Sequence, residues 1–169
     1  PPNHPMTIRE LMSHTGGLTY GIFASSPVDS NYREAELLSN DLTNREFTRR
    51  LGKIPLKHQP GSRWEYSVAV DVQGYLVEKL SGLPFDEFLD SRIFEPLNMV
   101  DTDFYVSEDK INRFAQVYSY NDAGELEAGE GFAFSNFLED PAFHSGGGGL
   151  VSTANDYMRF SQMLLNGGE

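Results

Sequence analysis

The sequence predicts a mainly α-helical fold with one β-hairpin. Several stretches repeat apolar residues at helical spacing, and most of them begin with a residue that can cap a helix. Only one stretch alternates on both sides of a turn, as a hairpin does. The chain has 169 residues, of which 39% are hydrophobic, so it can bury one core. We therefore expect a single segment, residues 1–169, in which helices pack on helices.

Two capping boxes mark the first helices. Residues 7–10, Thr-Ile-Arg-Glu, are one of them, and they predict a short helix over residues 8–14. Residues 43–46, Thr-Asn-Arg-Glu, are the other, and they predict the next well-defined helix. Between the two boxes the pattern is weak. There we expect a loop over residues 25–27 and a helix with few apolar anchors over residues 31–38.

Residues 60–76 place a tyrosine at the junction between a loop and a helix. Pro60-Gly61 is turn chemistry, and a short extended run with the only Trp of the chain leads to Tyr66. From Val68 onward, apolar residues recur at helical spacing. Packing can fix the ring of Tyr66 while its hydroxyl points into a cleft, where a phenol can act as a catalytic acid or base. An ordinary half-buried tyrosine is the alternative interpretation of this residue alone.

The next stretch predicts two helical pieces and the hairpin. Pro84 suits the first turn of a helix whose apolar face runs as far as Pro96. A short helical piece is expected over residues 107–114. Residues 115–120 follow the alternating pattern of a strand, residues 121–124 form a turn, and residues 125–127 form the returning strand, which predicts the hairpin.

The last stretch predicts a loop, a close backbone approach and a final helix. Residues 132–143 are aromatic and have no period, which indicates a loop pressed against the body. Four glycines at 146–149 indicate that the backbone passes close to another group or takes a positive φ. Thr153 predicts the start of the last helix. We expect that helix to bury an apolar stripe formed by Tyr157, Phe160, Met163 and Leu164.

The composition excludes several classes of function. The chain has 13 basic and 25 acidic residues, a net charge of -12 that repels nucleic acid and anionic membranes, so we expect neither as a partner. No stretch resembles a transmembrane run or a signal peptide. The chain has no Cys, and its four His residues lack a paired-ligand spacing. We therefore expect no metal and no cofactor.

Four blocks of the chain resemble the serine β-lactamase-related hydrolases, which include class C β-lactamases, DD-peptidases and class VIII carboxylesterases. In family order, the blocks are residues 7–18, 60–67, 95–102 and 147–157. The resemblance implies a partial β-lactamase/transpeptidase-like fold, the helical lobe without most of the central antiparallel sheet. It also implies that residues 1–169 are an internal segment, the helical domain of a larger serine hydrolase. The remaining sheet domain of that parent chain would then be its partner.

The resemblance further implies a catalytic set of three motifs: a Ser-x-x-Lys nucleophile, a motif containing a tyrosine, and a Lys/His-Thr-Gly type of motif. Only the second is found, as Tyr66-Ser67, and the family places the others outside the matching blocks. Tyr66 is therefore the one residue that we assign to catalysis. The expected function is hydrolysis of a small-molecule ester or amide through an acyl-enzyme. The segment alone is expected to be inactive, because Ser-x-x-Lys is missing.

The residues around Tyr66 favour an esterase over a β-lactamase or a D-peptidase. In the lactamase pattern, the residue two positions after the tyrosine is usually Asn, whereas here it is Val68. With Trp64 just before, this apolar residue is more typical of the class VIII esterases. The candidate substrate-binding residues are Trp64, Val68, His144, Ser145 and Gly147, of which the last three belong to a loop that can line the cleft. A catalytically dead family member that binds a peptidoglycan-like or protein partner is the alternative.

Two short matches to the missing motifs are interpreted as structural. Residues 107–110 read Ser-Glu-Asp-Lys, but they follow Tyr66 rather than precede it, and their acidic middle indicates a capped surface helix. Residues 14–16 read His-Thr-Gly, but they follow a helix and lie within the first family block. We interpret them as a helix exit.

Overall fold

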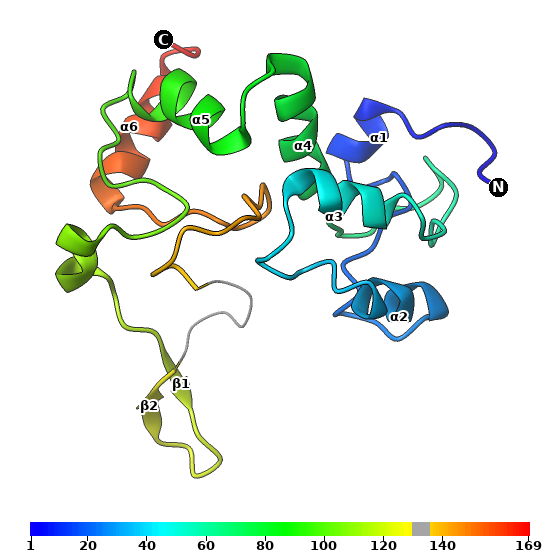
Figure 1. The fold of residues 1–169 in the computed structure, drawn as a ribbon, viewed down its shortest axis with the longest axis horizontal. Helices are drawn as coiled ribbons and strands as arrows, with labels where there is room; N and C mark the ends of the chain where they lie inside the picture. Colours follow the sequence, from blue (N-terminus) through cyan, green and yellow to red (C-terminus); the bar gives the residue numbers. More distant parts are fainter. Residues whose placement is uncertain (130–135) are drawn as a thin grey trace.

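The computed structural model describes residues 1–129 and 136–169 (Figure 1). Within them, helices α1 to α4 gather at one end, α5 and α6 lie at the other, and a two-stranded antiparallel sheet extends away from both. The elements in chain order are α1 (Ile8–Met12), α2 (Pro27–Glu34), α3 (Asn44–Leu51), α4 (Ala69–Ser81), α5 (Phe85–Leu89), the π-helical turn η1 (Asp90–Phe94), the 3-10 helix η2 (Glu108–Arg113), β1 (Tyr118–Tyr120), β2 (Leu126–Ala128) and α6 (Ala154–Leu165). The prediction of a mainly helical fold with one hairpin is confirmed.

The caps explain where the first helices begin. The Thr7 side chain accepts a hydrogen bond from the Glu10 N–H, and the Glu10 carboxylate accepts one from the Thr7 N–H. Helix α1 ends earlier than predicted, because His14 already takes a positive φ of 55°. The loop predicted over residues 25–27 ends at Ser26, which caps α2 in a capping box with Asp29. The helix runs from Pro27 to Glu34, so it begins and ends four residues earlier than the predicted 31–38.

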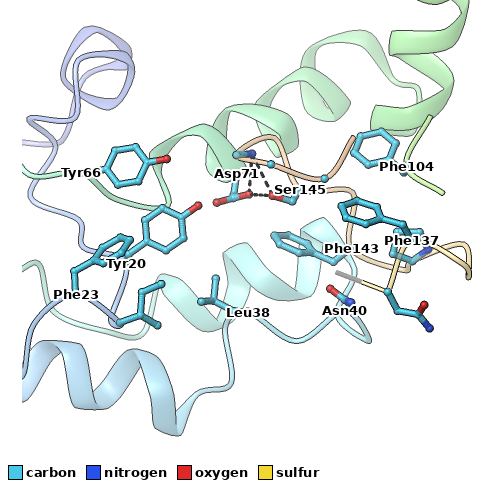
Figure 2. Close-up of a pocket in the computed structure, with 16 residues that line it drawn as sticks. Tyr20, Phe23, Leu38, Asn40, Tyr66, Asp71, Phe104, Phe137, Phe143 and Ser145 are labelled. Atoms are coloured by element: carbon cyan, nitrogen blue, oxygen red, sulfur yellow. Dashed lines mark hydrogen bonds between the residues drawn. The ribbon is translucent and has the colours of Figure 1, made fainter. Parts of the chain in front are cut away.

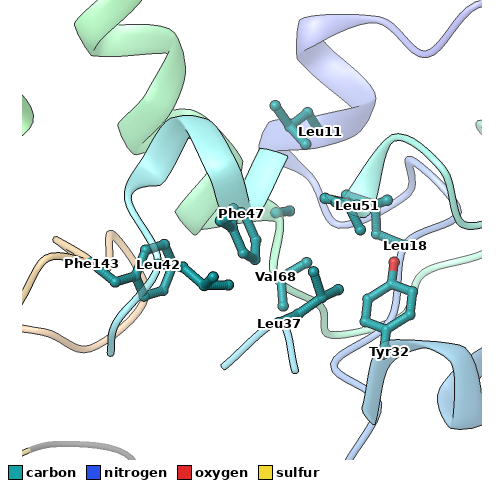
Figure 3. Packing of buried hydrophobic residues seen from close by; sticks show 10 residues of the cluster. Leu11, Leu18, Tyr32, Leu37, Leu42, Phe47, Leu51, Val68 and Phe143 are labelled. Carbon is teal, nitrogen blue, oxygen red and sulfur yellow. The ribbon is translucent and has the colours of Figure 1, made fainter. Parts of the chain in front are cut away.

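The core lies where α3 and α4 meet the segments that precede them (Figure 3). Thr43 caps α3, and Leu42 before it and Phe47 in the first turns of the helix are both buried, as in a hydrophobic staple. Phe47 packs on Phe143, with ring centroids 4.9 Å apart, and this contact ties the loop before the glycines to the core. The buried members of the cluster are Leu11, Leu18, Tyr32, Leu37, Leu42, Phe47, Leu51, Val68, Ala69 and Phe143.

Helix α4 ends at Gly82, which takes the left-handed conformation with a φ of 78°. The chain then turns back so that α5 packs on α4. A Cβ at Gly74 would lie 3.2 Å from the ring of Phe85, so this glycine lets the two helices approach closely. The predicted helix from Pro84 continues beyond α5 as η1.

The hairpin pairs Tyr118 with Ala128 and Tyr120 with Leu126. Both strands are exposed along their length. The predicted loop over residues 132–143 is seen from residue 136 onward, and its first four residues lie outside the described residues.

The prediction of a buried stripe on α6 is wrong. Tyr157 is 66% exposed and Leu164 is 59% exposed. The amphipathic pattern correctly marks a helix, but no described segment covers these two side chains. Helix α6 is attached instead through Asp156, a fully buried carboxylate that accepts hydrogen bonds from the Asp101 N–H and the Thr102 hydroxyl. None of the helices in the described part of the chain has the length and apolar character needed to cross a membrane.

Candidate active site

A pocket of about 420 Å³ opens between the segment after α1, the start of α4 and the loop that contains glycines 146–149, called the glycine loop below (Figure 2). This volume is within the range of small-molecule sites. Six aromatic side chains form most of its walls: Tyr20, Phe23, Tyr66, Phe104, Phe137 and Phe143. The polar lining includes Asp71 and Ser145, and glycines 147–149 complete one side. The pocket is thus apolar around its walls and polar at a few points.

Tyr66 is held at the end of the extended run that leads into α4. Its ring stacks on Tyr20, with centroids 5.3 Å apart, and contacts the ring of His14 at 5.1 Å. The next residue, Ser67, is buried, and its hydroxyl lies 3.2 Å from His14 Nδ1. On the other side, the Glu65 N–H donates to the His14 carbonyl at 2.9 Å. Packing thus fixes the ring, which remains 45% exposed, and the hydroxyl points into the pocket (Figure 2).

An ion-pair network lies next to Tyr20 and Tyr66 in the sequence and in space. Lys57 Nζ pairs with Glu65 and, at 3.2 Å, with Asp29, while His58 Nε2 lies 2.6 Å from the second oxygen of Glu65. The Thr19 hydroxyl donates to Asp29 at 2.6 Å. Burial opposes ionisation of both carboxyls, but their hydrogen bonds outweigh it: those from Ser26, Thr19 and Lys57 lower the pKa of Asp29, and those from Lys57 and His58 lower the pKa of Glu65. The network therefore joins the residues that directly precede Tyr20 and Tyr66.

Asp71 places a carboxylate in the pocket from the first turn of α4. One of its oxygens, Oδ1, accepts a hydrogen bond from the Ser145 hydroxyl at 2.5 Å and another from the Gly147 N–H at 3.2 Å. Burial raises the pKa of Asp71 above its ordinary value, and these hydrogen bonds offset only part of the effect. Burial and then the charge of Asp71 also raise the pKa of Tyr20. Asp71 thus anchors the glycine loop against α4.

The glycine loop passes as close to its neighbours as the sequence predicts. A Cβ at Gly146 would lie 2.4 Å from the Val70 carbonyl oxygen, and one at Gly147 would lie 2.9 Å from the Tyr20 hydroxyl. A Cβ at Gly148 would meet nothing within 4 Å. Close approach is therefore the reason for glycine at the first two of these positions.

The structure brings together only some of the residues proposed from the sequence. Tyr66, Ser145 and Gly147 line the pocket. Trp64 is 63% exposed and sits at the edge of His14, and Val68 is 0% exposed because the start of α4 turns it into the core. Neither side chain lines the pocket.

His144 also faces away from the pocket. Its ring packs on Phe104 with centroids 4.6 Å apart, and its nitrogens lie 3.1 Å from Asp86 and 3.6 Å from Asp140. The substrate-binding interpretation of Trp64, Val68 and His144 therefore does not fit this pocket, because their side chains point into other contacts.

Sequence reasoning did not find two polar residues of the pocket, Tyr20 and Asp71. Asp71 stands between Val70 and Val72 in the first turn of α4, and a charge between two apolar residues at that point is the signal that could have identified it. Tyr20 lies in a stretch without a periodic pattern and carries no comparable signal.

Neither of the two short motif matches lines the pocket. Ser107 and Lys110 line a separate hollow of about 100 Å³, where Lys110 pairs with Asp101 at 3.3 Å. His14 lies two residues after the end of α1, and its ring contacts the ring of Tyr66. Within residues 1–129 and 136–169, no cluster of three or more His, Asp or Glu side chains could hold a metal ion.

Comparison with known proteins places this chain in a family. The model of the family named Beta-lactamase matches residues 1–169. Protein Rv1367c from Mycobacterium tuberculosis is 36% identical over 168 residues, which cover 99% of this chain and 41% of that protein. Esterase EstB from Burkholderia gladioli is 35% identical over 170 residues, covering 91% of this chain and 43% of the esterase. The chain thus spans about two fifths of the length of these curated relatives.

The solved structure of EstCE1, described as a hydrolase with promiscuous acyltransferase activity, superposes with a TM-score of 0.78 at 30% sequence identity. The match covers 97% of this chain and 47% of EstCE1. The helical body with its hairpin is therefore part of a β-lactamase-like fold, and the chain belongs to the Beta-lactamase family.

Proposed function

We propose that this chain is the helical part of a serine hydrolase that cleaves a small ester through an acyl-enzyme, with Tyr66 as the general acid and base. The observation that carries the proposal is the position of Tyr66, whose ring is fixed by Tyr20 and His14 and whose hydroxyl faces an aromatic-lined pocket. Membership of the Beta-lactamase family and the similarity to an esterase support it.

The chemistry follows from what a serine nucleophile requires. A serine hydroxyl attacks an acyl carbon only when a neighbouring base takes its proton, and a phenolate stabilised by a lysine ammonium can be that base. The serine oxygen then bonds to the acyl carbon, and the ester oxygen leaves with the proton that the phenol returns to it. Tyr66 performs both transfers in this proposal. The serine and the lysine are those of the Ser-x-x-Lys that the family resemblance implies.

An ester is favoured over a β-lactam by the walls of the pocket. They are mostly aromatic rings, and Val68, at the position of the lactamase-type Asn, is buried in the core and offers no amide to a substrate. An apolar acyl group suits such walls because its burial needs no hydrogen-bond partner.

The test is Tyr66→Phe in the full-length protein, assayed with a short-chain nitrophenyl ester. The ring and its packing remain, so the unfolding midpoint should change little, while kcat should fall by about two to four orders of magnitude. Tyr32→Phe is the matched control: this buried tyrosine accepts a hydrogen bond from the Thr19 N–H, outside the pocket. It should lower the midpoint and keep most of the turnover.

Near-normal turnover of Tyr66→Phe together with a lowered midpoint would remove Tyr66 from the catalytic role. A full-length sequence with no Ser-x-x-Lys other than residues 107–110 would instead favour a family member that only binds its ligand, because the acyl-enzyme would lack its nucleophile.

A further inference from the structure

The carboxylate of Asp71 is buried in the pocket without a cation beside it. Asp71 is 2% exposed, and its two hydrogen-bond donors, the Ser145 hydroxyl and the Gly147 N–H, both bond to Oδ1. Across residues 1–129 and 136–169, no Lys, Arg or His forms an ion pair with it. Buried charges in proteins are ordinarily paired, because an unpaired one loses its hydration without compensation. Among the described residues, none donates a hydrogen bond to the second oxygen, Oδ2, and Figure 2 shows the carboxylate facing the tyrosines of the pocket.

Aromatic rings stand on both sides of this carboxylate. Figure 2 shows Tyr20, Phe23 and Tyr66 on one side of Asp71, and Phe104, Phe137 and Phe143 on the other. The rings of the first group contact one another, with Tyr66 lying 5.3 Å from Tyr20 and 6.2 Å from Phe23. The face of an aromatic ring carries negative partial charge and attracts a cation within about 6 Å of its centroid. A carboxylate with rings on either side thus combines two attractions for the same kind of group.

The net charge of the chain also favours a cationic ligand. Its net charge of -12 creates a potential that concentrates cations near the surface and disfavours anions. In the polar part of the pocket, the hydroxyls of Tyr20 and Tyr66 both point toward Asp71 (Figure 2). Neither side chain brings positive charge, so a cationic ligand would meet no like charge from these residues.

We propose that the pocket recognises an ammonium group on its substrate, held against Asp71 Oδ2 and between the aromatic walls. The substrate class is then an ester or amide that carries a positively charged amine. Hydrolysis of this ligand rests on the proposed hydrolase function, whereas binding of its positive charge does not. The reaction itself is unchanged: the ammonium group takes no part in bond breaking.

The first experiment compares two esters on the full-length protein. Acetylcholine and 3,3-dimethylbutyl acetate have the same shape and differ in the charge of one atom. We expect kcat/KM to be about tenfold or more higher for acetylcholine, and we expect Asp71→Asn to remove this preference. Asparagine can still accept the hydrogen bonds from Ser145 and Gly147, so the glycine loop should stay in place.

Asp156→Asn is the matched control. Asp156 is also a fully buried carboxylate held by O–H and N–H donors, and its loss changes the net charge equally, but it does not line the pocket. The preference for acetylcholine should survive this change.

Equal kcat/KM values for the two esters in the wild type, or a preference that Asp71→Asn leaves intact, would overturn the inference. The wild-type comparison needs no variant, so it remains a test even where Asp71→Asn lowers stability.

The second experiment measures binding without turnover. Benzyltrimethylammonium is titrated into the full-length protein and into both variants by calorimetry, and Asp71→Asn should weaken its Kd about tenfold or more. A protein that binds this cation through Asp71 but hydrolyses no ester contradicts the proposed function and supports the inference. A protein that hydrolyses both esters equally, and whose affinity for the cation is independent of Asp71, supports the proposed function and overturns the inference.

Discussion

At the scale of single residues, Glu65 and Thr19 each precede a tyrosine of the pocket and are joined through Lys57 and Asp29. We expect the positions of Tyr20 and Tyr66 to depend on these charged residues, which do not line the pocket. A shift of about 1 Å in a catalytic group is enough to cost much of the rate. We accordingly treat Glu65 as a positioning residue.

Glu65→Gln in the full-length protein tests this role. The amide keeps the shape but removes the charge opposite Lys57 and His58, so we expect about 2 kcal/mol less stability and a kcat lowered about tenfold with little change in KM. Glu46→Gln is the control, since Glu46 likewise bridges two cations, Arg49 and Arg50, but on the surface of α3. It should leave turnover unchanged. Equal kcat values for wild type and Glu65→Gln would show that the network only stabilises the fold.

Val68 gives a second prediction at this scale. Its side chain is fully buried in the core cluster, so Val68→Asn would place an amide among apolar side chains without partners. We expect a loss of about 2–4 kcal/mol of stability, measured by denaturant unfolding. Val100→Asn makes the same change at an exposed position and should stay within about 0.5 kcal/mol of the wild type. If Val68→Asn were as stable as wild type, the side chain would have to face the cavity after all.

At the scale of elements, the predictions held where a local rule acts alone. The helix starts at Thr7, Thr43 and Thr153 are decided by neighbours in sequence, because each threonine accepts a hydrogen bond from the N–H three residues later. The helix predicted over residues 31–38 begins earlier in the structure, at Pro27, because Ser26 forms a capping box with Asp29, an acid shorter than the usual Glu or Gln. A pattern search sees Ser-Ser-Pro and predicts a loop.

The candidate site was only partly predictable for a related reason. Tyr66 stands out because an extended run meets a helix at that point, which is a local feature. The contact of Asp71 with Ser145 joins residues 74 positions apart, and no period or spacing in one sequence encodes it. Ser145 and Gly147 line the pocket whereas His144 does not, because the direction of each side chain depends on partners such as Asp86 and Phe104.

The prediction at the scale of elements concerns the stability of variants in the glycine loop. Gly146→Ala would push a methyl group against the Val70 carbonyl, so we expect about 1–3 kcal/mol less stability and a weakened contact between Ser145 and Asp71. Gly148→Ala meets open space and should be nearly neutral. The unfolding midpoints of the two variants provide the comparison. Equal midpoints would mean that the loop can move away from α4 at no cost.

At the scale of the whole molecule, helix α6 leaves apolar side chains open on the surface. Tyr157, Met158, Leu164 and Leu165 are all exposed. Exposed apolar groups of this extent commonly mark a contact surface. The partner that we propose for it is the sheet domain that the family resemblance implies in a longer parent chain. The amphipathic stripe predicted from the sequence would then be an interface with that domain, which explains why it was mistaken for core.

The last prediction concerns residues 1–169 on their own, which we expect to hydrolyse no ester. The one Ser-x-x-Lys in the chain, residues 107–110, lies on an exposed 3-10 helix and lines a hollow that Tyr66 does not share. Its lysine pairs with Asp101, which also binds Arg113, so it is engaged at that hollow rather than beside Tyr66. In the full-length protein, Ser107→Ala should retain wild-type turnover of a nitrophenyl ester, in contrast to Tyr66→Phe. Turnover by the purified 169 residues that Ser107→Ala abolishes would make Ser107 the nucleophile and would require η2 to rearrange toward the pocket.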